Sequence, residues 1–238
     1  MERALLAGEL QAARQIQAML APAQIPTIPG LAIDVAFHPM RDVGGDFYLC
    51  RVLANGRQRL LLGDVSGKGA AAAMTAALLI GGAEDHDDYS PAQLLAHLDR
   101  VLRESQIGNF ATCQCADFSP DGRITLANAG HLPPYRRGLE IPVEQSLPLG
   151  LSGHKSDYSE LEISAEPGDT LTFLSDGVVE ARSPSGELFG FDRAAAISRE
   201  SAEKVALAAQ AFGQEDDITV LTLTFSGVPA LGPQAAPS

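Results

Sequence analysis

Four apolar, strand-like segments of this chain run directly into an aspartate that has glycine or another small residue beside it. They are VGGDF (Asp46), LLLGDVSGKG (Asp64), LTFLSDGVVE (Asp176) and QEDDITV (Asp216 and Asp217). Aspartate is depleted from strands because an unpaired buried carboxylate is costly. One such residue would be explained as a turn or cap residue, but four together indicate that a positive charge lies among them. The chain is therefore expected to bring these strand ends together.

Alternating apolar patterns from residue 31 onward predict strands joined by short turns. Asn55-Gly56 and the SPDGR segment are typical of hairpin turns. Runs of antiparallel strands with two central helices favour an α+β fold in layers over a βαβ repeat. The predicted helices are KGAAAAMTAALLIGGA, ending at Gly81-Gly82, then about 91–105, and one near 192–211.

The chain divides into three parts by pattern. Residues 1–24 are expected to form a helix and linker, 25–225 one large domain, and 226–238 a disordered tail. Within 3–20, the apolar spacing is 4-3-4-3, which is typical of a short dimerising coiled coil. An amphipathic helix that packs on its own domain explains the pattern equally well. The positions in this spacing are Leu6, Leu10, Ala13, Gln17 and Leu20.

Charge and cysteine content narrow the class of protein. The 17 basic and 30 acidic residues give a net charge of -13, which argues against nucleic acid or an anionic membrane as the main partner. No run approaches the ~18 apolar residues of a membrane span. The odd set of Cys50, Cys113 and Cys115 indicates reduced thiols and a cytoplasmic setting. Cys113 and Cys115 point the same way from a predicted strand, so we expect buried core thiols and not a zinc site.

A set of eight motifs resembles one known family. Two look-alikes fit poorly: GDVSGKG has the wrong spacing for a P-loop, and GGDF lacks the second acidic residue of diguanylate cyclases. The set is similar, over residues 9–225, to the SpoIIE/RsbU branch of the PPM (type 2C) metal-dependent protein serine/threonine phosphatases. The resemblance implies an α-β-β-α layered sandwich with a two-metal site at one end of the packed sheets. The motifs are ELQAARQIQAMLAP, MRDVGGDFY, LLGDVSGKGAAAAM, NAGHLPPY, LPLGL, PGDTLTFLSDGVVEA, GELFGFDR and DDITVLTLTF.

The resemblance assigns metal-binding roles to the strand-end carboxylates. It implies that Asp64 bridges two metal ions, that the Val65 carbonyl adds a ligand, and that Asp46 ligates the first ion or lines its hydration shell. Asp176 and Asp216 would ligate the second ion. The expected cofactor is a pair of divalent ions, Mn²⁺ or Mg²⁺, because both prefer oxygen ligands. The pair would activate a shared water for in-line attack on phosphorus.

Other residues are expected to support these ligands. Asp217 would support the site without ligating, and Gly45 would let its strand curve in beneath the metals. Arg41 matches the family's phosphate-binding arginine and could grip a phosphate bidentately, with a surface arginine as the alternative. Ser66 stands where many type 2C enzymes carry histidine, so the general acid is left open. We interpret His131 of NAGHLPPY as a structural histidine that fixes a loop.

The resemblance implies a cytoplasmic bacterial phosphatase that acts on phosphoserine or phosphothreonine of a partner protein. The expected partner is a STAS-type anti-sigma-factor antagonist in a partner-switching pathway, and the expected assembly is a homodimer through residues 3–20. The chain could also be the catalytic domain of a larger sensor protein. Two alternatives stay open. One is a pseudophosphatase that binds a phosphoprotein, because Leu49 stands where the branch usually has aspartate. The other is a phosphohydrolase for small molecules.

Overall fold

The structure is a computed structural model that describes residues 25–40, 44–151 and 157–227. The predicted helix over 3–20, Arg41 and the tail from residue 228 lie outside these ranges, so the expectations for them stay predictions. Within the described ranges, no helix combines the length and the apolar character needed to cross a membrane.

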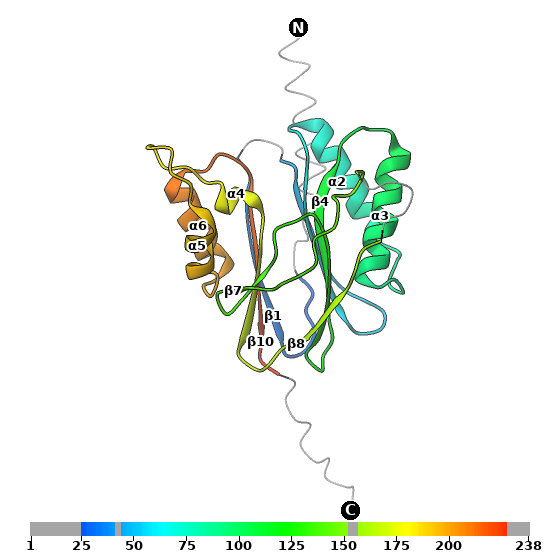
Figure 1. Cartoon of the computed structure of the whole chain (residues 1–238). Coiled ribbons are helices and arrows are strands. Elements are labelled where there is room, and N and C mark those ends of the chain that lie inside the picture. The colour runs from blue at the N-terminus through cyan, green and yellow to red at the C-terminus, as the bar shows by residue number, and fades with distance from the viewer. Residues whose placement is uncertain (1–24, 41–43, 152–156, 228–238) are drawn as a thin grey trace, which may run out of the picture.

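Two antiparallel sheets pack face to face, as Figure 1 shows. The strands are β1 (Leu31–His38), β2 (Asp46–Val52), β3 (Gln58–Val65), β4 (Ala111–Phe118), β5 (Arg123–Ala129), β6 (Tyr135–Arg136), β7 (Leu139–Glu140), β8 (Leu161–Ser164), β9 (Asp169–Leu174) and β10 (Ile218–Phe225). The first sheet has the order β1-β10-β9-β6-β7 and the second β2-β3-β4-β5-β8. The predicted strands are confirmed by this arrangement.

Both predicted hairpins are present. The β2–β3 turn contains Gly56 at φ 78°, and the β4–β5 turn contains Gly122 at φ 88°. Glycine adopts this left-handed backbone without the steric cost of a side chain. The β2–β3 register places Asp46 directly opposite Asp64, and the next strand, β4, places Thr112 opposite Asp64.

Helices cover the outer face of each sheet (Figure 1). The second sheet carries α2 (Ala70–Ala83) and α3 (Pro91–Ser105), and the first carries α4 (Asp176–Val179), α5 (Gly190–Ile197) and α6 (Ala202–Gly213). Helix α3 begins where predicted because the Ser90 hydroxyl accepts a hydrogen bond from the Gln93 amide and Pro91 follows. The layers are therefore α-β-β-α, as the family resemblance implies.

The two glycines that were predicted to end α2 lie inside its last turn. The helix continues through Gly81 and Gly82 to Ala83. A Cβ atom at Gly82 would lie 3.2 Å from a methyl carbon of Leu98 on α3. The glycine therefore allows close helix packing instead of ending the helix.

The single helix predicted near 192–211 is two helices. Helix α5 ends at Ile197, and α6 begins at Ala202 after a short break. The Ser201 hydroxyl accepts a hydrogen bond from the Lys204 amide, so this serine is the N-cap of a new helix. The sequence pattern missed the break because apolar residues continue on both sides of it.

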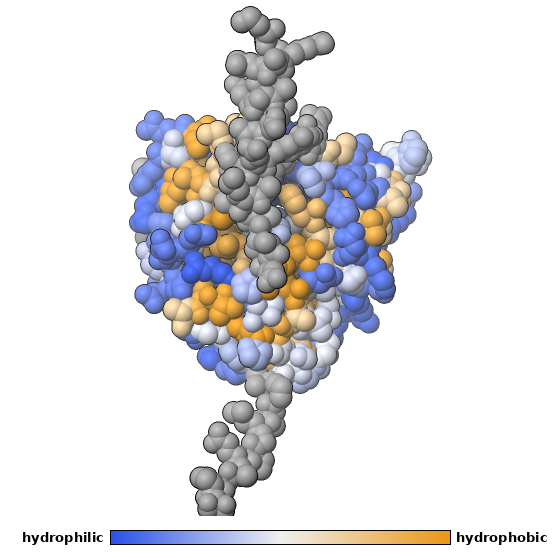
Figure 2. Space-filling model, turned by 180° about the vertical axis from the view of Figure 1, so that it is seen from behind, coloured by the Kyte–Doolittle hydropathy of each residue, from blue (hydrophilic) through white to orange (hydrophobic). Residues whose placement is uncertain are grey.

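Apolar side chains form three buried layers, one between the sheets and one beneath each helical layer. Seen from behind, polar residues gather at both outer sides and apolar residues toward the middle (Figure 2). Cys50 is buried between the sheets, and Cys113 and Cys115 are buried beneath α2 and α3. The prediction of core thiols is confirmed. Burial raises the pKa of all three thiols, that of Cys50 to about 12.

One buried ion pair holds the loop over residues 84–90 against the second sheet. Arg59 is 0% exposed, and its Nε and Nη2 donate to the two carboxylate oxygens of Asp117, both at 2.7 Å. Its remaining donors reach the carbonyl oxygens of His86 at 3.0 Å and Tyr89 at 2.5 Å. The guanidinium charge is thus compensated inside the fold, as a buried charge requires.

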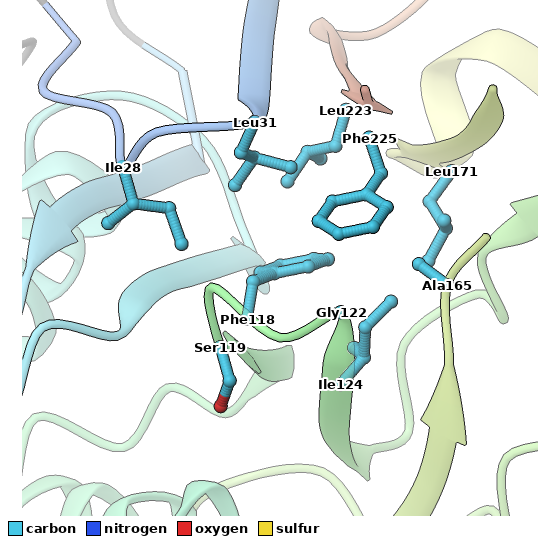
Figure 3. A pocket seen from close by; sticks show the side chains of 10 residues that line it. All are labelled: Ile28, Leu31, Phe118, Ser119, Gly122, Ile124, Ala165, Leu171, Leu223 and Phe225. Atoms are coloured by element: carbon cyan, nitrogen blue, oxygen red, sulfur yellow. The ribbon is translucent and has the colours of Figure 1, made fainter. Parts of the chain in front are cut away.

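A small apolar pocket lies between the two sheets where β4 and β10 end (Figure 3). Phe118 and Phe225 lie at its centre, Ile28 and Leu31 line one side, and the Ser119 hydroxyl points away. This lining offers nothing that would bind a phosphate or a cation. The polar chemistry of the molecule lies at the other end of the sheets.

Candidate functional site

The predicted carboxylates come from both sheets and gather at the end of the sandwich opposite the apolar pocket. Asp46 begins β2, and Asp64 lies one residue before the end of β3. Asp176 begins α4, separated from the end of β9 by one residue, and Asp216 lies two residues before β10. Asp64 is within electrostatic reach of Asp176, Asp216 and Asp217. The structure thus brings these side chains together, and their role as metal ligands stays a prediction.

Asp46 is the most buried of these carboxylates, at 2% exposure. Its Oδ2 accepts a hydrogen bond from the Thr219 hydroxyl of β10, across the gap between the two sheets. Burial raises the pKa of Asp46 well above its usual value, and the charge of Asp64 raises it further. The ionised form is therefore disfavoured here unless a positive charge is nearby.

The pKa values of Asp64 and Asp176 are raised for the same reasons as that of Asp46. Burial, followed by the charges of Asp176 and Asp216, raises the pKa of Asp64 to about 7. Burial also raises the pKa of Asp176, with added repulsion from Glu180 and Asp216. Several carboxylates that repel one another in one place indicate a site suited to a cation.

Asp217 holds the loop that precedes β2. Its two carboxylate oxygens accept hydrogen bonds from the amides of Met40 and Gly45, each at 2.9 Å. The side chain is 5% exposed, and a Cβ atom at Gly44 would lie only 1.7 Å from its Oδ2. Both oxygens of Asp217 are thus occupied by the backbone donors of Met40 and Gly45, and its expected role in supporting a metal site stays a prediction.

Gly45 lies against two oxygens of the proposed ligands. A Cβ atom there would lie 2.6 Å from Asp64 Oδ1 and 2.6 Å from the Val65 carbonyl oxygen. The Val65 amide also donates to the Gly45 carbonyl at 3.1 Å. The glycine therefore leaves both oxygens free to approach a common point, a stronger reason for glycine than strand curvature alone.

This contact yields a first prediction. Gly45→Ala should displace Asp64 or Val65 and weaken Mn²⁺ binding by about 10-fold or more, the usual cost of disturbing groups that orient ligands. Isothermal titration with Mn²⁺ measures it. Gly81→Ala is the matched control, because a Cβ atom at Gly81 meets nothing within 4 Å. Equal Mn²⁺ affinity in Gly45→Ala and the unsubstituted chain would contradict the predicted ligand geometry.

His131 and Leu49 also have clear places. His131 is 4% exposed, and its Nδ1 lies 2.9 Å from the Thr112 hydroxyl. Burial lowers the pKa of His131 to about 4, so the ring is neutral near pH 7, which favours the structural interpretation over a proton donor. Leu49 packs in the apolar layer beneath α2 and α3, away from Asp46. The aspartate that it replaces therefore would not have faced these carboxylates.

Sequence reasoning missed two polar residues behind the site. Thr219 donates to Asp46, and the Ser175 hydroxyl accepts from the Thr219 amide at 3.0 Å. Ser175 also donates to the Asp217 carbonyl oxygen at 3.2 Å. Serine and threonine in apolar strands carry no local signal of such contacts, since the contacts depend on how the two sheets pack.

The oxygen donors of this cleft fit a hard divalent cation. They are carboxylate oxygens and, next to Asp64 Oδ1, the Val65 carbonyl, the ligand type that Mg²⁺ and Mn²⁺ prefer. In the described part of the chain, no three His, Cys, Asp or Glu side chains enclose an ion by themselves. Water would have to complete the coordination, as is usual for Mg²⁺.

Two packed antiparallel sheets between helical layers form the fold that PP2C phosphatase domains share. The profile of the stage II sporulation protein E (SpoIIE) family matches residues 54–226. The chain therefore belongs to the SpoIIE family, as the motif resemblance predicts.

Known proteins agree with this assignment. The chain is 28% identical over 190 residues to the phosphoserine phosphatase RsbU of Bacillus subtilis, a match over 76% of this chain and 56% of RsbU. It spans 34% of the length of another curated relative. The chain thus corresponds to part of these longer proteins.

Solved structures share the fold. The SiaA-PP2C domain of Pseudomonas aeruginosa superposes with a TM-score of 0.75 at 22% identity, over 94% of this chain and 98% of that one. The catalytic domain of the serine/threonine phosphatase PstP of Mycobacterium tuberculosis, in complex with two manganese ions, has a TM-score of 0.61 at 19% identity. That match covers 82% of this chain and 97% of the catalytic-domain chain.

Proposed function

We propose that this chain is a metal-dependent phosphatase that hydrolyses phosphoserine or phosphothreonine on a partner protein. The observation that carries the proposal is the gathering of Asp46, Asp64, Asp176 and Asp216 from two sheets into one region whose negative charges repel one another. Such an arrangement is costly without a cation. Membership of the SpoIIE family supports the same reaction.

The proposal assigns a role to each of these residues. Asp64 and the Val65 carbonyl would hold the cations from the β3 side, with Asp46 beneath them. Asp176 and Asp216 would hold the second cation from the other sheet. When bound, two divalent cations would supply Lewis-acid activation of water and charge neutralisation at phosphorus. The cofactor proposed is a pair of Mn²⁺ or Mg²⁺ ions, which the two manganese ions in the PstP structure support.

Four further residues have proposed roles around the site. Asp217 and Gly45 keep the loop before β2 in place through the hydrogen bond between them. Arg41, which belongs to this loop in sequence, remains the proposed phosphate-binding residue. His131 is proposed to fix the start of β4 through Thr112, so the leaving alkoxide must take its proton from another donor.

The proposed partner is a phosphorylated STAS-type anti-sigma-factor antagonist in a partner-switching pathway. The similarity to RsbU, a phosphoserine phosphatase, supports this choice. We also propose a homodimer through residues 3–20. The three cysteines, all free and buried, are in keeping with the reducing cytoplasm as its location.

Metal removal tests the activity directly. With Mn²⁺, the protein should release phosphate from p-nitrophenyl phosphate and from a phosphorylated STAS protein, and excess chelator should reduce the rate at least about 10³-fold. Phosphate release measured by malachite green follows both reactions. Readdition of Mn²⁺ should restore the rate, which controls for unfolding.

The two substrates separate the alternatives. Turnover of the phosphoprotein at a far higher kcat/KM than p-nitrophenyl phosphate is the expected result. Tight binding of the phosphoprotein and Mn²⁺ without turnover of either substrate would favour the pseudophosphatase. Turnover of small phosphate esters alone would favour the small-molecule phosphohydrolase.

A further inference from the structure

Lys68 forms an ion pair with one of the proposed metal ligands. Its Nζ lies 3.1 Å from Asp216 Oδ2, and the two side chains are 56% and 48% exposed. Lys68 lies just before α2, three residues after Val65, whereas Asp216 precedes β10 in the other sheet. The pair therefore spans the mouth of the site between the two sheets.

Both residues line the same small cleft. Gly44, Gly45 and Asp217 form other parts of its wall, and Gly45 lies directly over Asp64 Oδ1. Among the described residues that line this cleft, Lys68 is the one basic side chain. A phosphate ester carries negative charge, so a cleft walled by carboxylates repels it unless positive charges are supplied.

The ion pair between Lys68 and Asp216 is weak enough for a metal ion to break it. Exposed lysine–carboxylate pairs contribute little because water screens them and both side chains lose freedom. A divalent cation at Asp216 carries twice the charge of the ammonium and would displace it. The flexible four-carbon stem of lysine would leave the displaced ammonium within the cleft.

We infer that Lys68 is an internal counter-cation of Asp216 that a metal ion displaces, and that the released ammonium then binds the phosphate group of the substrate. The inference rests on the proposed function, because it assigns Asp216 to the metal and the cleft to the phosphate. By this inference, Lys68 has opposite effects on the affinity for metal and on the affinity for phosphate. The lysine weakens metal binding at Asp216 and strengthens phosphate binding once the metal is present.

Metal titration of Lys68→Gln tests the first effect without any need for turnover. Removing one charge at this distance should tighten Mn²⁺ binding at Asp216 about fivefold. Lys68→Arg keeps the charge and should behave as the unsubstituted chain. Lys204→Gln is the matched control, because Lys204 pairs with Glu200 at 2.8 Å on the exposed start of α6. Equal or weaker Mn²⁺ binding by Lys68→Gln would overturn the inference.

Phosphate titration tests the second effect. Inorganic phosphate added to the Mg²⁺-saturated protein should bind Lys68→Gln about fivefold more weakly than the unsubstituted chain, with Lys204→Gln unchanged. Equal phosphate affinity in Lys68→Gln would overturn the phosphate-binding role. A chain that binds Mn²⁺ yet turns over neither substrate would contradict the proposed function and leave the metal-displacement result intact. A chain that binds no Mn²⁺ would overturn both.

Discussion

Asp64→Asn should lower kcat/KM for p-nitrophenyl phosphate by at least about 10³-fold, since a proposed ligand of the metal pair would lose its charge. The fold should survive the substitution. The raised pKa of Asp64, about 7, means that the ionised carboxylate destabilises the metal-free fold as pH rises through that value. Metal-free Asp64→Asn should therefore have a Tm equal to or above that of the unsubstituted chain at pH 8. The difference should shrink toward pH 5, where Asp64 is protonated.

Steady-state kinetics with Mn²⁺ measure the loss of kcat/KM, and thermal melts with chelator measure the change in Tm. Asp85→Asn is a suitable control, because Asp85 is exposed in the loop over 84–90 and is not one of the proposed metal ligands. A fully active Asp64→Asn protein would remove the proposed mechanism. An inactive variant with a Tm far below that of the unsubstituted chain would instead show that Asp64 is needed for folding.

Asp117→Asn should be the most destabilising single change outside the site. It leaves the guanidinium of Arg59, which is 0% exposed, without its carboxylate partner, and breaking a buried pair on one side costs about 3–5 kcal/mol of unfolding free energy. Urea unfolding followed by circular dichroism measures this loss. Asp121→Asn breaks the exposed pair with Arg123, at 3.2 Å, and should cost no more than about 1 kcal/mol.

A double variant sharpens this second test. Arg59→Met combined with Asp117→Leu removes both charges and should recover part of the stability lost in Asp117→Asn, because the uncompensated charge is gone. A double variant less stable than Asp117→Asn would indicate that the hydrogen bonds from Arg59 to His86 and Tyr89 matter more than charge compensation.

The sequence predicted most of the strands and turns because their signals are local. Asn55-Gly56 needs only its own backbone conformation to form a turn, and Ser90 with Pro91 defines a helix start by itself. The end of α2 depends on contact between Gly82 and Leu98 of another helix. Such tertiary contacts leave no trace in a local pattern, so the two glycines were taken as a helix end although the helix runs through them.

The same contrast holds in the site. The carboxylates could be predicted, because an aspartate at the end of an apolar strand is conspicuous in any sequence. Their surroundings could not: the contact of Thr219 with Asp46 and the pair between Lys68 and Asp216 each join segments about 150 residues apart or more. Arg59 is a conspicuous charged residue in the apolar run of β3, but no nearby sequence signal indicates that Asp117 is its partner.

The pairing of β1 with β10 places Leu31 opposite Phe225. The polypeptide thus enters and leaves the sandwich at neighbouring points, on the side remote from the carboxylates. A domain whose two ends lie close together can be inserted between other domains of a longer polypeptide without separating its sheets or covering the opening of its cleft. The same catalytic fold could therefore be joined to different neighbouring domains.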